Sequence, residues 1–253
     1  MKTLILFAYN NRANIFDENL DFFLNFGVFE SESCDFCIIV SGVSTKSISL
    51  KGKNMRILER DNKYGDFGAW GHALENYNIT NYGNFIFLND TCRGPYIQGT
   101  CSVDMWPQLF LSGINDQCKL VGPTKNTMFA DHIQSYAFGC DKIALDLLIK
   151  HKIFSPVLDY PAKKQEFILK HEVEMSQIIL KNGYTLKSFF KSHSSCPIIL
   201  SPWQVMFIKV NMSMRFDKSE IQNSLPHSSP QRVKKFQEKK ENKLIVARKL
   251  LKK

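Results

Sequence analysis

The chain has 253 residues, 44% of them hydrophobic and 23% charged, which predicts one large folded α/β domain with an appendage and excludes a disordered chain. Residues 218–253 carry 11 Lys/Arg against 3 Asp/Glu, so most of the net charge of +9 lies in this tail. The nearly neutral remainder argues against a nucleic-acid-binding fold, which needs its basic surface on the folded domain.

Short apolar runs alternate with helical patterns in the first third of the chain. Strands are expected at residues 4–8, 36–40, 55–58 and 85–88. A helix between the first two carries Phe16, Leu20, Phe23 and Leu24 on one face and ends at Gly27. A second helix, between the third and fourth strands, begins near Asp66 and places Trp70, Ala73, Leu74 and Tyr77 on one face.

The alternation continues toward the C-terminus. Further strands are expected near residues 119–122 and 135–138, with helices over residues 142–150 and 165–181, and residues 203–210 close the domain. Strands separated by helices indicate βαβ units, so the fold class is α/β with a mostly parallel sheet flanked by helices. The domain is expected to span residues 1–212, followed by a basic tail at residues 213–253.

Cysteine usage and hydropathy indicate a cytoplasmic protein. The seven cysteines are an odd number, and the Cys34/Cys37 pair has no second pair at zinc spacing, which favours buried, reduced thiols over a metal or redox site. Residues 1–8 are too short an apolar run for a signal peptide and are expected to form a strand. No stretch approaches the roughly 18 apolar residues that a membrane span needs.

Two loops that follow predicted strands carry residues suited to ligand binding, because open α/β sheets bind ligands beyond the carboxyl ends of their strands. In residues 60–70, Gly65 and Gly68 permit close backbone approach, and Asp61 and Asp66 can accept hydrogen bonds from hydroxyls.

The second loop, residues 89–95, holds a carboxylate at Asp90 for a divalent ion and Arg93 for a phosphate. Taken alone, each loop is equally compatible with an ordinary capped turn.

Together the two loops resemble a known arrangement. The sequence DFGAW at residues 66–70, followed by FIFLNDTCRGP at residues 85–95, is similar to the rhamnan synthesis protein F group of glycosyltransferases and to capsid-glycan enzymes of large algal viruses. Weaker similarities are HIQS at residues 132–135, residues 172–184 and residues 202–211, so the resemblance covers about residues 1–212. It implies a GT-A-like (Rossmann-like) domain that transfers a sugar from a nucleoside diphosphate to a glycan or glycoprotein acceptor.

The resemblance also implies site roles. Donor-binding residues would be Asn62, Asp66, Gly68, Asn89, Asp90, Arg93 and Lys209. The metal-binding motif of the family has two acids, whereas this chain has Asn89-Asp90-Thr91, so Mn²⁺ or Mg²⁺ would depend on Asp90 together with donor phosphates and water. His132 or Asp131 is a candidate to complete that site, and a satisfied surface pair is the alternative.

A catalytic base is expected on the helix at residues 165–181. At 100° per residue, Glu172 and Ser176 fall on its apolar face, whereas Glu174 and His171 lie opposite. A carboxylate buried in a cleft has a raised pKa, which suits a general base, so Glu172 is the candidate. The alternative is a buried Glu172 with a purely structural role, paired with an Arg or Lys.

Two other interpretations stay open. The incomplete acid motif also fits a nucleotide-sugar-binding or scaffold domain without catalysis. The tail at residues 213–253 is compatible with a basic amphipathic helix on a membrane surface, a contact with a protein partner, or a solvated extension.

Overall fold

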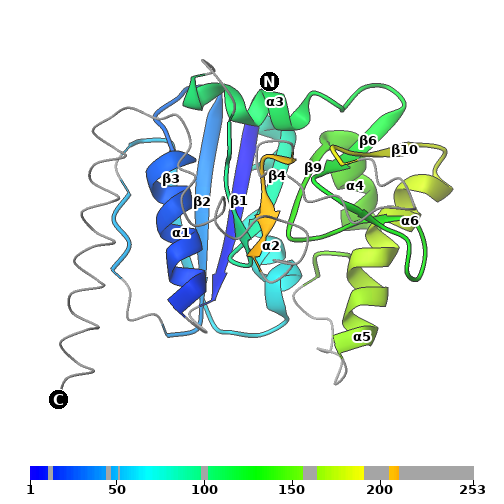
Figure 1. The fold of residues 1–253 in the computed structure, drawn as a ribbon, viewed down its shortest axis with the longest axis horizontal. Helices are drawn as coiled ribbons and strands as arrows, with labels where there is room; N and C mark the ends of the chain where they lie inside the picture. Colours follow the sequence, from blue (N-terminus) through cyan, green and yellow to red (C-terminus); the bar gives the residue numbers. More distant parts are fainter. Residues whose placement is uncertain are drawn as a thin grey trace.

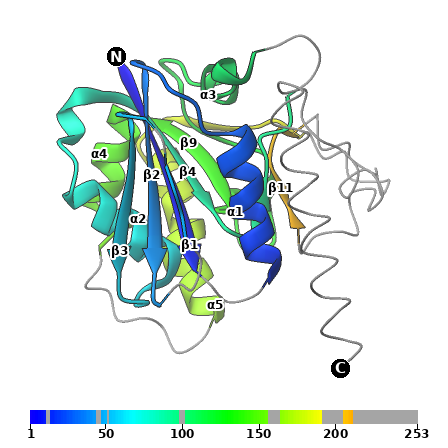
Figure 2. The ribbon, with the colours of Figure 1, turned by 90° about the vertical axis from the view of Figure 1, so that its left-hand side faces the viewer.

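A seven-stranded sheet with helices on both faces forms the centre of the computed structural model (Figures 1 and 2). The structure describes residues 1–10, 14–43, 47–50, 52–97, 102–155, 164–190 and 205–210. The expected tail at residues 213–253 and residues 203–204 of the predicted segment 203–210 lie outside these ranges. None of the helices within them is long and apolar enough to cross a membrane.

The sheet has the strand order β10-β6-β9-β4-β1-β2-β3. Its strands are β1 (Lys2–Asn10), β2 (Cys34–Ser41), β3 (Met55–Arg60), β4 (Tyr82–Asn89), β6 (Cys118–Gly122), β9 (Ala137–Asp141) and β10 (Thr185–Ser188). β1 runs parallel to β2 and β4, β2 to β3, and β10 to β6, whereas β9 is antiparallel to β4 and β6. The order 3-2-1-4 is that of a Rossmann-type nucleotide-binding half, so the α/β, mostly parallel prediction is confirmed.

Two hydrophobic clusters hold the helices against the two faces of the sheet. α1 (Asn14–Phe26) and α3 (Trp106–Leu111) cover one face, where Phe23 and Trp106 are buried. α2 (Gly65–Glu75), α4 (Lys142–Lys150) and α6 (Glu174–Lys181) cover the other, with Trp70, Leu145 and Ile179 in its core. Figure 2 shows α1 on one side of the strands and α2 and α4 on the other. The inner strands β1, β2 and β4 are buried on both faces, which explains why they read as continuous apolar runs.

Two short antiparallel strand pairs lie beside the main sheet. β5 (Cys92–Arg93) pairs antiparallel with β11 (Ile208–Lys209), and β7 (Lys125–Asn126) pairs with β8 (His132–Ile133). The first pair returns the C-terminal part of the described chain to the loop after β4. Two single 3-10 turns, η1 (Ile79–Asn81) and η2 (Val103–Met105), complete the described elements.

The helix predicted at residues 165–181 has a different internal geometry. It consists of α5 (Lys164–Phe167), a π-helical segment η3 (Ile168–Val173) and α6. The wider π turn changes which side chains face the core, because its hydrogen bonds span five residues instead of four. His171, expected opposite the apolar face, is therefore buried, and so is Ile178, whereas Leu169 is 39% exposed. Glu172 and Ser176 are buried, as expected.

The cysteines within the described ranges are free and buried. They are Cys34, Cys37, Cys92, Cys118 and Cys140. Burial raises the pKa of the Cys37 thiol to about 12. Burial also raises the pKa of the thiols of Cys34, Cys92 and Cys140, so these four thiols are protonated and unreactive at neutral pH, in line with the buried-thiol interpretation.

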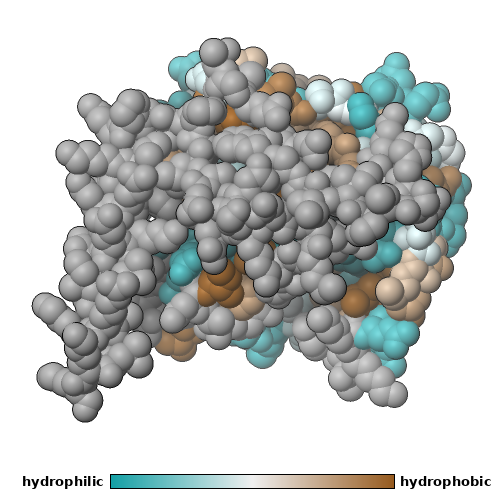
Figure 3. Space-filling model, in the orientation of Figure 1, coloured by the Kyte–Doolittle hydropathy of each residue, from teal (hydrophilic) through white to brown (hydrophobic). Residues whose placement is uncertain are grey.

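On the face seen in Figure 3, the described residues that remain in view are mixed in hydropathy. Scattered apolar side chains of this kind are ordinary for a folded surface.

Candidate active site

Polar residues from the two predicted loops form one hydrogen-bonded network at the carboxyl ends of β1 and β4. The Asn89 amide donates to Oδ2 of Asp66 over 2.7 Å. The neighbouring carboxylate, Asp90, accepts a hydrogen bond of 2.7 Å from the backbone N–H of Asn10. The Asn10 side chain in turn donates to Oδ1 of Asn62 over 2.7 Å. The structure therefore brings Asn62, Asp66, Asn89 and Asp90 together.

Local backbone chemistry sets this arrangement. β1 and β4 are parallel neighbours, so their carboxyl ends meet at the same edge of the sheet. Asp66 lies in the first turn of α2, where a negative charge is favourable. Oδ1 of Asn89 accepts hydrogen bonds from the backbone N–H and the hydroxyl of Thr91, which turns its amide toward Asp66. Asn89 and Asp90 are both buried.

Gly68 is required by the loop that precedes α2. A Cβ at this position would lie 2.6 Å from Cβ of Tyr64 and 3.6 Å from a guanidinium nitrogen of Arg60. Tyr64 and Gly65 both have left-handed backbones, with φ of 63° and 56°. The tight turn into α2 therefore explains this glycine without a ligand.

Arg93 is engaged by α1. Its Nε donates to Oδ1 of Asn19 over 3.0 Å, and its guanidinium lies 3.2 Å from a carboxylate oxygen of Glu18. Asn19 also donates to the backbone carbonyl of Asp90 over 2.7 Å. These contacts brace the loop after β4 against α1, which sequence reasoning did not anticipate.

A second polar cluster surrounds Glu172. Its Oε2 accepts hydrogen bonds from the Ser135 backbone N–H at 2.9 Å and from the Ser135 hydroxyl. Its Oε1 lies 3.3 Å from Nε2 of His132, a distance that fits an ion pair although the geometry is poor for a hydrogen bond. Nδ1 of His132 lies 2.7 Å from the Ala130 carbonyl. The residues in contact with Glu172 are thus His132 and Ser135, and not the Lys or Arg of the structural alternative.

The electrostatics of this cluster correct one expectation. Burial by itself raises the pKa of Glu172, but the contacts with His132 and Ser135 and the charge of Lys209 outweigh it, so the pKa lies below its usual value. Burial likewise opposes charge on His132, yet Glu172 and the Ala130 carbonyl raise its pKa. Glu172 is therefore an ionised carboxylate at rest, and the expected raised pKa is wrong.

The two clusters are neighbours. The Asn89 backbone N–H donates to the carbonyl of Tyr136 over 3.1 Å, and Tyr136 directly follows Ser135. Lys209, on β11, lies with its Nζ 5.8 Å from the centre of the Tyr136 ring. Lys209 pairs in register with Cys92 in the loop after β4, and its charge lowers the pKa of Glu172.

The donor set for a metal ion is sparse. Within the described parts of the chain, no group of three or more His, Cys, Asp or Glu side chains could hold a metal. His132 faces Glu172 through Nε2 and a carbonyl through Nδ1, and Asp131 pairs with Lys125 at 2.8 Å. Neither fits the completing ligand that the sequence suggested. The carboxylate at Asp90 fits only the mode in which substrate phosphates and water supply most ligands.

Three large aromatic side chains of a type that often stacks on sugar rings belong to the core of this protein. Trp70, Tyr96 and Trp106 are all buried. Nε1 of Trp70 donates to the Leu88 carbonyl over 3.2 Å, and Nε1 of Trp106 donates to the Gly27 carbonyl over 2.7 Å. These three side chains are therefore not accessible for stacking on a sugar ring.

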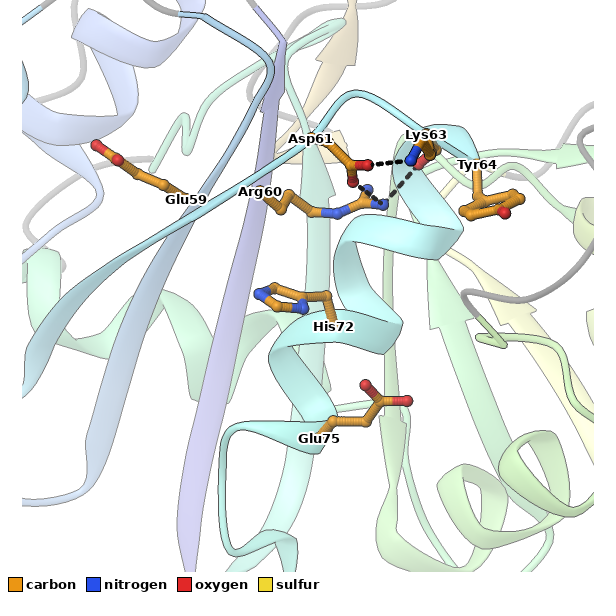
Figure 4. Close-up of a pocket in the computed structure, with 7 residues that line it drawn as sticks. All are labelled: Glu59, Arg60, Asp61, Lys63, Tyr64, His72 and Glu75. Carbon is orange, nitrogen blue, oxygen red and sulfur yellow. Dashed lines mark hydrogen bonds and ion pairs between the residues drawn. The ribbon is translucent and has the colours of Figure 1, made fainter.

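A separate pocket of about 430 Å³ lies where β3 meets α2. Figure 4 shows Arg60, Asp61 and Lys63 linked by polar contacts above His72 and Glu75 of α2. Asp61 lies 2.6 Å from Lys63 and is exposed. The lining includes none of Asp66, Asn89, Asp90 or Glu172, so Asp61 belongs to this pocket and Asp66 to the polar network.

Sequence reasoning missed two residues of these clusters. Asn10 follows the first strand in a segment that looks unremarkable because it lacks glycine. Ser135 lies within the HIQS stretch, where no pattern marks the serine as a partner of Glu172. Only the position of Asn10 at a strand end could have indicated it.

Comparisons with known proteins agree with this geometry. The family model of rhamnan synthesis protein F matches residues 41–215. No curated protein matches the sequence.

Three solved structures resemble the fold at low identity. One is the mannosyltransferase PcManGT from Pyrobaculum calidifontis in complex with GDP-Man and Mn²⁺, with 10% identity, a TM-score of 0.47, and coverage of 74% of this chain and 54% of that chain. A second is the apo-form glycosyltransferase GlyE of Streptococcus pneumoniae TIGR4, with 8% identity, a TM-score of 0.43, and coverage of 74% of this chain and 45% of that chain. A third is a glycosyltransferase involved in glycosylation of the major capsid of PBCV-1, with 10% identity, a TM-score of 0.40, and coverage of 74% of this chain and 82% of that chain.

This chain spans about half the length of PcManGT and of GlyE. The match that identifies the family is instead the family model, which covers more than half of the chain in one continuous stretch. The chain belongs to the rhamnan synthesis protein F family.

Proposed function

We propose that this chain transfers a sugar from a nucleoside diphosphate to a hydroxyl of a glycan or glycoprotein acceptor. The observation that carries the proposal is the network Asn62–Asn10–Asp90 and Asp66–Asn89 at the carboxyl ends of β1 and β4. That edge is where Rossmann-type sheets bind nucleotides, and the Glu172 cluster adjoins it.

The donor would lie across the network. Asp66 and Asn62 offer oxygens for ribose or sugar hydroxyls, and Asn89 orients Asp66. Lys209 would offer the positive charge that a leaving diphosphate needs, because it pairs with the loop after β4 and its charge acts on Glu172. Arg93 and Gly68 would support the donor loops through the contacts that hold those loops in place.

A divalent ion, Mn²⁺ or Mg²⁺, would be held by Asp90 together with the donor phosphates and water. Such an ion supplies neutralisation of the negative charge on the leaving group. Asp90 is suited to this position because its backbone and carboxylate are anchored to β1, with Asp90 N–H bonded to the Ala8 carbonyl at 3.0 Å.

Glu172 would serve as the base for the acceptor hydroxyl. A base that activates the acceptor for direct displacement leads to inversion at the anomeric carbon. Its position beside Lys209 and Ser135 supports the assignment, since the acceptor and the diphosphate must meet near one carbon atom.

The test is transfer with a panel of nucleotide sugars, with and without Mn²⁺. We expect turnover of at least one donor, and loss of at least about 100-fold in kcat for Glu172→Gln. Asp90→Asn should abolish donor turnover. The matched control is Glu174→Gln, because Glu174 lies two residues away on the same helical region with a side chain 43% exposed.

Two outcomes would contradict the proposal. Full activity in Glu172→Gln removes the base assignment. Tight binding of a nucleotide sugar to the wild type, with neither transfer nor hydrolysis for any donor, identifies a binding domain instead of an enzyme.

A further inference from the structure

The carboxylate of Glu172 is shielded from direct contact with a substrate. The residue is only 9% exposed. Oε1 faces His132 at 3.3 Å, and Oε2 accepts both the backbone N–H and the hydroxyl of Ser135. Each oxygen is therefore already engaged by a neighbouring side chain, and an acceptor hydroxyl has little surface of Glu172 to approach.

Ser135 stands at the open side of this cluster. It is partly exposed, whereas His132 and Gln134 beside it are buried. Its hydroxyl donates to Oε2 of Glu172, so both lone pairs of Oγ remain as acceptors for another O–H group. A hydroxyl in this position can receive a hydrogen bond from solvent or substrate while it passes its own proton inward.

We propose that Ser135 is a catalytic residue that relays the proton of the acceptor hydroxyl to Glu172. The inference rests on the proposed glycosyl transfer and adds a residue to it. Ser135 would contact the acceptor, and Glu172 would receive the proton. His132 is a positioning residue, because its Nε2 lies beside Oε1 of the Glu172 carboxylate.

The step balances without any further reagent. The acceptor oxygen forms a bond to the anomeric carbon as the bond from that carbon to the diphosphate oxygen breaks. The acceptor O–H proton moves to Oγ of Ser135 while the Ser135 proton moves to Oε2 of Glu172. The products are the glycoside, the nucleoside diphosphate and a protonated Glu172, which later returns the proton to solvent.

The tautomer of His132 fits its positioning role. A carbonyl oxygen only accepts, so Nδ1 carries a proton directed at Ala130. The Glu172 carboxylate at 3.3 Å favours protonation of Nε2 as well, since two lone pairs at that distance would repel, and the contact is then an ion pair. This contact directs Oε1 toward His132 and leaves Oε2 for Ser135.

The position of Ser135 also matches the donor side. Tyr136, the next residue, accepts a hydrogen bond from the Asn89 backbone N–H at 3.1 Å. Ser135 is therefore the chain neighbour of a residue that is hydrogen-bonded to Asn89, the last residue of β4, which belongs to the donor network. An acceptor oxygen above Ser135 would face the donor across a short gap, which is what transfer requires.

The experiment compares the full chain with Ser135→Ala, Ser135→Thr and Ser176→Ala in the transfer assay. We expect Ser135→Ala to lower kcat by about 100-fold while the Kd of the donor and the thermal midpoint change little, because the backbone N–H to Glu172 remains. Ser135→Thr keeps a hydroxyl and should recover most of the rate. Solvent isotope effects should indicate two moving protons in wild type and fewer in Ser135→Ala.

Ser176→Ala is the matched control, since the Ser176 hydroxyl accepts only the structural hydrogen bond from the Ile133 backbone at 3.0 Å. It should lose stability and keep kcat within a few fold. A Ser135→Ala enzyme within threefold of wild type overturns the relay alone. A wild type without turnover on the whole donor panel overturns the proposed function, and the relay with it.

Discussion

The side-chain amide of Asn89 donates a 2.7 Å hydrogen bond to the carboxylate of Asp66, and thereby ties the end of β4 to the first turn of α2. Asn89 is held in turn by two hydrogen bonds from Thr91. Asp66 is therefore oriented before any donor arrives, which lowers the entropic cost of binding.

Asp66→Ala should weaken donor binding by at least tenfold, because it removes an oriented acceptor for donor hydroxyls and leaves the Asn89 amide without this partner. Isothermal titration with the active nucleotide sugar measures the change. The matched control is Asp61→Ala, since Asp61 is an exposed carboxylate in the same loop that pairs with Lys63. Equal weakening in both variants would show that the loop charge matters and the Asp66–Asn89 contact does not.

Trp70→Phe should destabilise the fold by about 1–3 kcal/mol without changing substrate affinity. The indole donates a buried hydrogen bond to the Leu88 carbonyl, and Phe removes that donor and leaves a gap beside the carbonyl. Its ring also packs edge-on against Phe87 and Phe138. Urea denaturation measures the loss. A higher KM for donor or acceptor at unchanged stability would instead support contact with sugar.

Gly71→Ala should destabilise the fold by about 3 kcal/mol, since the new Cβ would lie 1.7 Å from the Phe154 carbonyl oxygen and backbone must shift. Gly183→Ala is the comparison. It has open space around the added methyl but a φ of +83°, so about 1 kcal/mol of backbone strain is expected. Gly71→Ala should therefore have the lower urea midpoint of the two variants. A lower midpoint for Gly183→Ala would contradict the packing of α2 against Phe154.

The contribution of the His132–Glu172 pair to stability should depend on pH. The pKa of His132 is raised, so its contribution is complete below the usual value of 6.5 and is lost as pH rises through the folded value. The pKa of Glu172 is lowered, so its contribution is present above the usual value of 4.5 and is lost as pH falls through the folded value. Both contributions coincide between about pH 4.5 and 6.5.

The difference in unfolding free energy between wild type and His132→Gln should therefore be larger at pH 5.5 than at pH 8.5. Denaturant titrations at the two pH values measure it. Lys209 and Asp131 also act on this pair, and both are present in the wild type and in the variant. A difference independent of pH would show that His132 stays neutral.

The elements of the fold were predictable because they depend on local pattern. The apolar run at residues 85–88 lies inside β4, and the helix predicted at residues 142–150 coincides with α4. The antiparallel direction of β9 was not predictable, since a strand buried on both faces reads the same in either direction.

The candidate site was predictable only in part. Asp66 and Asp90 stood out because strand ends and helix starts have recognisable sequences. The π turn before Glu174 could not be foreseen, because an α-helical period was assumed throughout that helix. The lowered pKa of Glu172 also depends on partners that are distant in sequence, Ser135 and His132.

The sequence by itself determined the α/β class, the succession of strands and helices, and the two loops that carry Asp66 and Asp90. Periodicity and turn chemistry act between near neighbours, so one chain read in order is sufficient for them. The tertiary structure alone decided that Ser135 meets Glu172, 37 residues away, and that Arg93 is engaged by α1. Such contacts follow from how buried faces pack and which polar groups must then be paired, and that choice is made only when the whole sheet assembles.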